Sequence, residues 1–112
     1  MKLSNGVAEA IDWAKAPESA RKGDPGVATA RTRQFGDVQV RVVTYSAGYV
    51  SDHWCPKGHI MHVLDGAFTI ELKNGKTFQL AKGMSFVTGD DDAAPHRLLT
   101  KSGATVFIVD EV

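Results

Sequence analysis

Three of the four histidines and the single cysteine of this chain fall within residues 48–66. Side chains two residues apart on an extended chain point to the same side, so His53, Cys55 and His59 share one face. A fourth candidate, His96, lies far along the chain and directly follows a proline. Imidazole nitrogen and thiolate sulfur suit zinc, iron, copper or nickel rather than magnesium or calcium. These residue types predict one transition-metal site, held by His53, Cys55, His59 and His96.

Zinc is the favoured ion, because three neutral imidazoles and one thiolate form a tetrahedral set that zinc accepts well. Iron, nickel and copper stay open, since affinity order alone does not decide which metal a protein takes up in a cell. A plainer interpretation also stays open, with Cys55 as a small buried apolar residue and the histidines as polar residues with hydrogen-bond partners. Metal affinity is expected to drop below about pH 6, where imidazoles take up protons.

Two polar neighbours of these residues are expected to lie outside the metal site. On a strand, His62 faces away from His59, which predicts a place on the outer layer or at a subunit contact. Asp52 likewise faces away from His53. It is predicted to anchor a neighbouring strand, and the alternative is a hydrogen-bond acceptor that orients a ligand.

The elements that must position these residues are strands. From residue 27 onward, apolar residues alternate with a period of two, which predicts strands. The expected strands cover residues 27–35, 38–46, 59–64, 67–73, 76–80, 84–88, 96–100 and 104–109. Residues 49–55 are expected to be extended. Met61 and Val63 share the parity of His59 and are predicted to point inward. The dipeptides Asp65-Gly66 and Asn74-Gly75 are strong hairpin signals. Eight or nine short strands separated by turns indicate an all-β sandwich or barrel.

Residues 1–26 are expected to form an N-terminal arm, and residues 27–112 a single barrel domain. Ile11 and Trp13 are the apolar anchors of the arm. Residues 7–16 could form one short helix, which is marginal unless it is packed. The arm is expected to lie across its own barrel or that of a partner. The arm and the exposed edges of a half-open barrel together predict a homodimer.

Composition narrows the classes of partner. The 112 residues are enough for one domain with a single core. Lysine plus arginine and aspartate plus glutamate both number 13, which gives no electrostatic reason to expect nucleic acid or an anionic membrane. A lone cysteine cannot form an internal disulfide, which favours a reducing cytoplasm. The N-terminus has no signal-peptide pattern, and the apolar run at residues 104–109 is too short to span a membrane.

The stretch GYVSDHWCPKGHIMHVLDG resembles the first motif of the cupin family, in which a glycine precedes His-x-His, a glutamate and a final glycine. His53 falls on the first histidine, Cys55 on the second and His59 on the glutamate. Gly66 takes the place of the final glycine. Further along, LAKGMSFVTGDDDAAPHRLL is similar to the second motif, whose histidine ligand corresponds to His96. Cys55 therefore replaces a histidine of the family pattern, and His59 replaces a carboxylate.

A closer resemblance covers nearly the whole chain. The segments IDW, TYSAGYVSDHWCPKGHIMHVLDG and KGMSF, with a later His-Arg pair, resemble a group of small single-domain bacterial cupins. That group is named for a signature of Asp, His, Cys and Trp, which reads here Asp52-His53-Trp54-Cys55. The resemblance implies a double-stranded β-helix, or jelly-roll barrel, with the metal site inside. It implies no settled activity.

Two functions fit these observations. The first is a metal-dependent enzyme that acts on a small molecule in the mouth of the barrel, which requires an open coordination position. The alternative is a non-catalytic module that binds a metal or a small ligand, such as a sensor, for which a closed four-ligand site would fit. An anionic substrate could be bound by arginines, although alternating arginines are typical of a solvent face: Arg31, Arg33, Arg41 and Arg97. The acidic run is typical of a solvated turn, with an acid or base at the cavity mouth as the alternative: Asp90, Asp91 and Asp92.

Overall fold

The computed structural model of the chain describes residues 1–90 and 94–112. In this part, strands dominate and the helical structure is one short 3-10 helix, η1. The elements are η1 (Trp13–Lys15), β1 (Glu18–Lys22), β2 (Val27–Phe35), β3 (Val38–Tyr45), β4 (His59–Leu72), β5 (Thr77–Ala81), β6 (Ser85–Thr88), β7 (His96–Leu99) and β8 (Ala104–Glu111). The described residues hold no helix that is both long and apolar enough for a membrane span. The predicted all-β class is confirmed.

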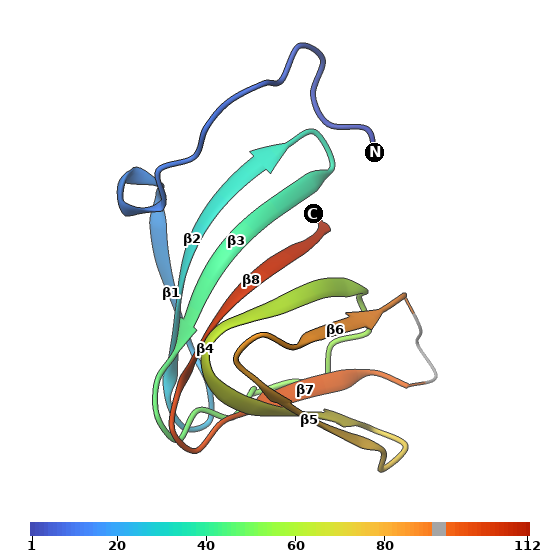
Figure 1. Cartoon of the computed structure of the whole chain (residues 1–112). Helices are drawn as coiled ribbons and strands as arrows, with labels where there is room; N and C mark the ends of the chain where they lie inside the picture. Colours follow the sequence, from blue (N-terminus) through green and yellow to red (C-terminus); the bar gives the residue numbers. More distant parts are fainter. Residues whose placement is uncertain (91–93) are drawn as a thin grey trace.

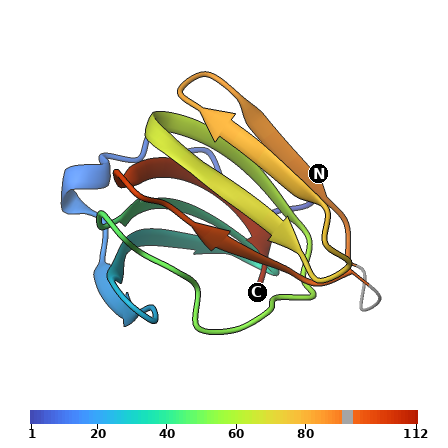
Figure 2. The same ribbon diagram turned by 90° about the horizontal axis from the view of Figure 1, so that it is seen from below.

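The strands are antiparallel, and the long strand β4 belongs to two sheets. One sheet contains β1, β2, β3, β8, the first half of β4, and β6. The other contains the second half of β4 with β5 and β7. β4 bends sharply, which brings β5 and β7 across from β3 and β8 (Figure 1). Figure 2 shows the two sheets face to face from below. This is the predicted jelly-roll barrel.

The bend in β4 lies at a dipeptide predicted to be a hairpin. Asp65 and Gly66 pair with β8, and the register shifts between Val63 and Asp65. The hairpin prediction at Asp65-Gly66 is therefore wrong. The positive φ of Gly66, +77°, suits a β-bulge as well as a hairpin turn, and the partner strand here is β8. The second predicted hairpin, at Asn74-Gly75, is confirmed and connects β4 to β5.

Gly66→Ala is expected to destabilise the fold by roughly 2 kcal/mol or more, because a side chain at positive φ is strained and has no room here. An added Cβ would run into the carbonyl oxygen of Gly103 and lie 2.9 Å from the Cα of Ala104. Gly75→Ala is the matched control, since Gly75 also has positive φ but no atom within 4 Å of the added Cβ. Chemical denaturation compares the two variants. Equal losses of stability would contradict the role of the close approach at Gly66.

The core fills the space between the two sheets. Met61 and Val63 are only 3% and 1% exposed, as their parity predicts. The same core cluster includes Ala28, Val43, Tyr49, Phe68, Ile70, Leu80, Phe86, Leu98, Ala104, Val106 and Ile108. Burial alternates along β8, and the row of inward apolar side chains ends at Asp110, which is also buried. The carboxylate of Asp110 therefore faces the interior of the barrel, after the last inward apolar side chain of β8.

The predicted arm lies against its own barrel. Residues 7–16, which the sequence allowed as one short, marginal helix, form only the single turn η1, with Asp12 Oδ1 accepting a hydrogen bond from the Ala14 amide at 3.1 Å. The full-length helix does not form, because so short a segment needs packing along its length to stay helical. Instead, β1 pairs with β2, and the ring of Trp13 meets the ring of Phe107 edge-on at 6.3 Å. The arm therefore extends the barrel sheet.

Candidate metal centre

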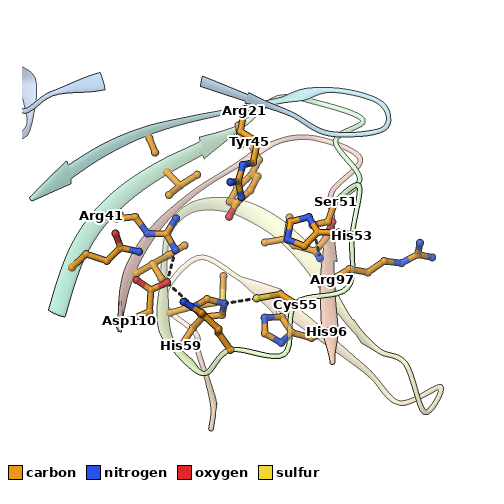
Figure 3. Close-up of a pocket in the computed structure, with 18 of the residues that line it drawn as sticks. Arg21, Arg41, Tyr45, Ser51, His53, Cys55, His59, His96, Arg97 and Asp110 are labelled. Atoms are coloured by element: carbon orange, nitrogen blue, oxygen red, sulfur yellow. Dashed lines mark hydrogen bonds and ion pairs between the residues drawn. The ribbon is translucent and has the colours of Figure 1, made fainter. Parts of the chain in front are cut away.

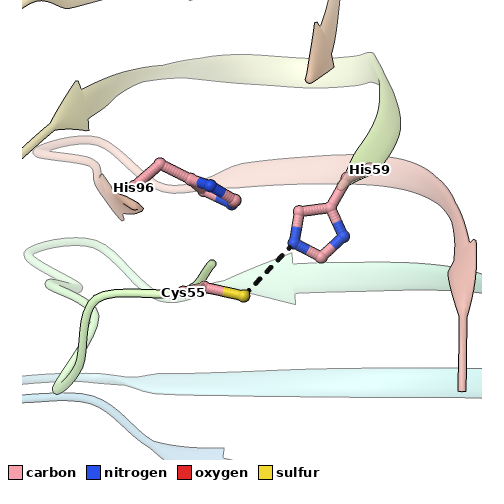
Figure 4. Close-up of side chains that lie close together, drawn as sticks. All are labelled: Cys55, His59 and His96. Carbon is pink, nitrogen blue, oxygen red and sulfur yellow. Dashed lines mark hydrogen bonds between the residues drawn. The ribbon is translucent and has the colours of Figure 1, made fainter. Parts of the chain in front are cut away.

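Three of the four predicted ligands lie together. The ligand atoms of Cys55, His59 and His96 are all within 4.8 Å of one another, and Figure 4 shows the three side chains converging. The backbone explains part of this placement. Cys55 and His96 form an isolated antiparallel bridge, in which each amide donates to the carbonyl of the other, at 2.7 and 2.9 Å. His59 begins β4, and its Nε2 lies 3.7 Å from the sulfur of Cys55.

A carboxylate supports His59 from behind. The Nδ1 of His59 lies 2.8 Å from Asp110 Oδ2, and the same oxygen accepts a hydrogen bond from Arg41 Nη2 at 2.5 Å. Burial raises the pKa of Asp110, but the hydrogen bond with His59 and the charge of Arg41 outweigh it and hold that pKa below its ordinary value. An ionised Asp110 favours the proton on Nδ1 of His59, which leaves the Nε2 lone pair free toward Cys55.

Sequence reasoning missed Asp110. The signal was present, because Asp110 continues the parity of Ala104, Val106 and Ile108 on the last strand. The predicted strand ended two residues too early, at Val109, while β8 runs on to Glu111. A charged residue at the end of a buried alternating row is the kind of signal that marks a functional side chain.

The three donors fit a transition-metal ion. Around a tetrahedral zinc ion, nitrogen and sulfur ligands lie about 3.5 Å apart. The three ligand atoms here lie up to 4.8 Å apart. A side-chain movement of about 1 Å would therefore bring them to the distances that zinc requires. One thiolate and two imidazoles form a borderline-to-soft donor set, and a carboxylate behind a ligating histidine is a common arrangement in metal sites.

The fourth predicted ligand, His53, lies outside this group of three. Its side chain is 54% exposed, and its Nδ1 lies 2.7 Å from Asp52 Oδ1. Asp52 thus acts as a hydrogen-bond acceptor for His53, which was the alternative interpretation from the sequence. The role of His53 as a ligand stays a prediction. His62, as expected, lies on the outer layer, with Nδ1 2.8 Å from Ser85 Oγ.

His96 is the most buried of the candidate ligands, at 6% exposure. Burial, followed by the charges of His59 and His53, lowers the pKa of His96 from 6.5 to about 4. The imidazole therefore stays neutral in the folded protein across most of the acidic range, and a neutral imidazole is the form that binds a metal.

This shift predicts how stability depends on pH. The unfolded chain takes up the His96 proton near pH 6.5, and the folded chain only near pH 4. The free energy of unfolding of metal-free protein is therefore expected to fall between these values as pH drops, by roughly 3 kcal/mol. Denaturation at several pH values measures it. His96→Gln should remove this component and His62→Gln should keep it, whereas an unchanged slope in the His96 variant would contradict the assignment.

The three residues line a cavity of about 840 Å³ inside the barrel. Figure 3 shows Arg41 and Tyr45 on one wall, the cysteine and two histidines on another, and Asp110 between Arg41 and His59. Apolar side chains line the interior: Val43, Met61, Ile70, Leu98 and Ile108.

The other charged residues singled out in the sequence have separate places. Arg31 and Arg33 form ion pairs with Glu18 and Glu9, which fits the solvent face predicted for them. The guanidinium of Arg97 lies over the Trp54 ring at 4.6 Å and pairs with Glu71 at 2.8 Å. In the acidic loop, Asp90 Oδ1 accepts a hydrogen bond from the Gly58 amide at 2.7 Å. Asp91 and Asp92 lie outside the described residues.

Comparison with known proteins identifies the fold through solved structures. No protein-family model and no curated protein matches the chain. Ectoine synthase from P. lautus superposes with a TM-score of 0.72 at 15% identity, over 93% of this chain and 78% of that one. A sugar phosphate isomerase of the cupin superfamily from Silicibacter pomeroyi gives 0.72 at 15% identity, over 93% and 76%. The polyketide cyclase RemF from Streptomyces resistomycificus gives 0.72 at 13% identity, over 94% and 80%.

The chain therefore has the fold of the cupin superfamily, as its sequence motifs predict. Within that fold it is a single barrel with a cysteine and two histidines gathered in the interior. Identities of this size show the fold alone, and one fold supports many unrelated activities.

Proposed function

We propose that the protein binds one transition-metal ion through Cys55, His59 and His96, with His53 as the predicted fourth ligand, and acts as a metal-dependent enzyme on a small molecule. The observation that carries this proposal is the convergence of three donor atoms within 4.8 Å on the wall of a cavity. Zinc is the favoured ion, and iron, nickel or copper suit the same donors. A bound ion would supply Lewis-acid chemistry, or redox chemistry if it were iron or copper.

The residues of the chain have distinct tasks in this proposal. Asp110 accepts a hydrogen bond from the Nδ1–H of His59 and fixes the orientation of that imidazole. Burial keeps His96 neutral and therefore competent as a ligand. Apolar side chains such as Met61, Ile70 and Ile108 line the cavity and exclude water from much of the space around a substrate. The cavity volume of about 840 Å³ is ample for a small molecule.

The alternative is a non-catalytic metal-binding or sensor barrel. A closed four-ligand site would favour it, and oxidation of the Cys55 thiolate would then be a natural signal. The exposure of His53 and its contact with Asp52 favour the enzyme, since an ion held only by Cys55, His59 and His96 would keep a coordination position open toward the cavity. Ligation by His53 as well would close the site and favour the alternative.

Substitution with cobalt(II) distinguishes the two functions. The enzyme is expected to give an absorption spectrum of thiolate-bound cobalt that changes when azide is added, because an open position accepts a further ligand. A tetrahedral spectrum that is insensitive to azide supports the non-catalytic module. A spectrum without a thiolate-to-cobalt band contradicts both. The homodimer and the cytoplasmic location expected from the sequence stay predictions.

A further inference from the structure

We propose that the substrate of this site is a small organic oxyanion, a carboxylate or a phosphate ester, whose charged group binds Arg41 and Tyr45 beside the metal. This inference rests on the proposed function, because it names the substrate class for the same cavity. The observations that support it concern the wall formed by β3.

Arg41 lies on the inward side of β3. It pairs across the sheet with Ile108 of β8 and Thr32 of β2, and all three side chains line the cavity. The side chain is only 24% exposed, so its charge sits where water competes poorly. A guanidinium has five N–H donors. The contact with Asp110 engages Nη2, and the buried Nε has no partner among the described residues.

Asp110 fixes Arg41 in this position without using up its donors. The carboxylate oxygen that accepts from Arg41 also lies 2.8 Å from Nδ1 of His59. Arg41 is thus separated from a metal-binding imidazole by a single carboxylate group. An oxyanion on the free side of the guanidinium would lie next to the metal ligands, which is the placement a reacting molecule needs.

Tyr45 adds a second donor on the same wall. It follows Arg41 by four residues on β3, an even spacing that places it on the same side of the strand, and it lines the cavity. Burial raises the pKa of Tyr45 above its ordinary value. The hydroxyl therefore keeps its proton at neutral pH and can donate a hydrogen bond to an anion.

The charges around the cavity favour an anion. Among the described residues, the cationic side chains that line it are Arg21, Arg41, Lys57 and Arg97, and the anionic ones are Asp110 and Glu111. Arg41 pairs with Asp110, and Arg97 pairs with Glu71. Among the described lining residues, this leaves two unpaired positive charges, those of Arg21 and Lys57, against one negative charge, that of Glu111. These three side chains are exposed, so the excess positive charge lies on the solvent-facing side of the cavity, where it attracts an anion.

The apolar part of the cavity indicates that the ligand has a hydrocarbon portion. Val43 lies between Arg41 and Tyr45 on β3, and Met61 and Ile70 of β4 line the same space. These side chains favour an anion with a hydrocarbon portion over a strongly hydrated inorganic ion.

Three matched probes test the inference: butyrate, its neutral amide butyramide, and methyl phosphate. Binding is followed by ¹H–¹⁵N NMR titration at pH 8, in both metal-free and zinc-loaded protein. The metal-free titration excludes direct ligation of the anion to the ion. We expect butyrate or methyl phosphate to bind at least about tenfold more tightly than butyramide in both forms, with the largest amide shifts on β3. The tighter of the two anions identifies the carboxylate or the phosphate ester.

Three variants identify the side chains that produce the preference for an anion over butyramide. Arg41→Gln should abolish the tenfold preference, and Tyr45→Phe should reduce it while leaving the Arg41–Asp110 pair intact. Arg33→Gln, on the solvent face, should keep it. Equal binding of butyrate and butyramide, no binding of either anion, or a preference that survives both cavity variants would overturn the inference. A metal titration on the same samples tests the proposed function separately, since a protein that binds anions but no metal would contradict only the latter.

Discussion

Cys55→Ser is expected to lower the affinity for zinc by more than about 100-fold. The thiolate is the only anionic donor among the converging ligands, and its loss would leave a weak set of imidazoles. A change of this size exceeds the effect usually seen when a residue behind a ligand is replaced. Competition with a chromophoric chelator at pH 8 measures the affinity, and far-UV circular dichroism checks that the variant is folded.

The histidines supply the controls for this result. His62→Ala should leave zinc affinity unchanged, because His62 lies on the outer layer against Ser85. His53→Ala decides between three and four protein ligands, since affinity falls strongly only if His53 binds the ion. A Cys55 variant that binds zinc as tightly as the original protein would exclude the thiolate as a ligand.

Asp110→Asn is expected to lower zinc affinity by about 10- to 100-fold. The amide keeps the shape of the side chain but loses the charge that favours the Nδ1–H form of His59 and that pairs with Arg41. The matched control is Glu111→Gln, which removes a carboxylate from the adjacent, exposed position of the same strand. The same chelator competition compares the two variants.

A second measurement separates positioning from simple destabilisation. In the original protein, ¹⁵N shifts of the His59 ring should show the Nδ1–H tautomer. In the Asp110 variant they should show a mixture of tautomers, whereas loss of packing alone would leave the tautomer unchanged. An Asp110 variant with the original zinc affinity and the original tautomer would contradict the role assigned to this carboxylate.

Local patterns predicted most of the barrel. Residues 27–35 were predicted with the bounds of β2 as the structure has them, because Gly26 and Gly36-Asp37 mark its two ends. Asp65-Gly66 could not be interpreted in the same way. A positive φ suits either a hairpin or a bulge, and only the pairing of β4 with β8, distant in the sequence, decides between them.

The site likewise contains residues that the local sequence predicts and residues that only strand pairing brings in. Cys55, His59 and His96 could be predicted from residue type and from their motifs. The parity argument does not extend to His53, because residues 51–54 form no strand and the chain bends at Asp52 and His53. Asp110 and Arg41 become part of the site only when β3, β8 and β4 pair. The sequence contained both residues, but not their contact with His59.

Elemental analysis of protein purified without a histidine tag tests the central claim most directly. One transition-metal ion per chain is expected, and the same preparation of His96→Ala should contain little or none. Protein that carries no metal, and that also fails to bind added zinc, iron(II), nickel or copper at pH 8, would contradict the proposal that these three side chains form a metal centre.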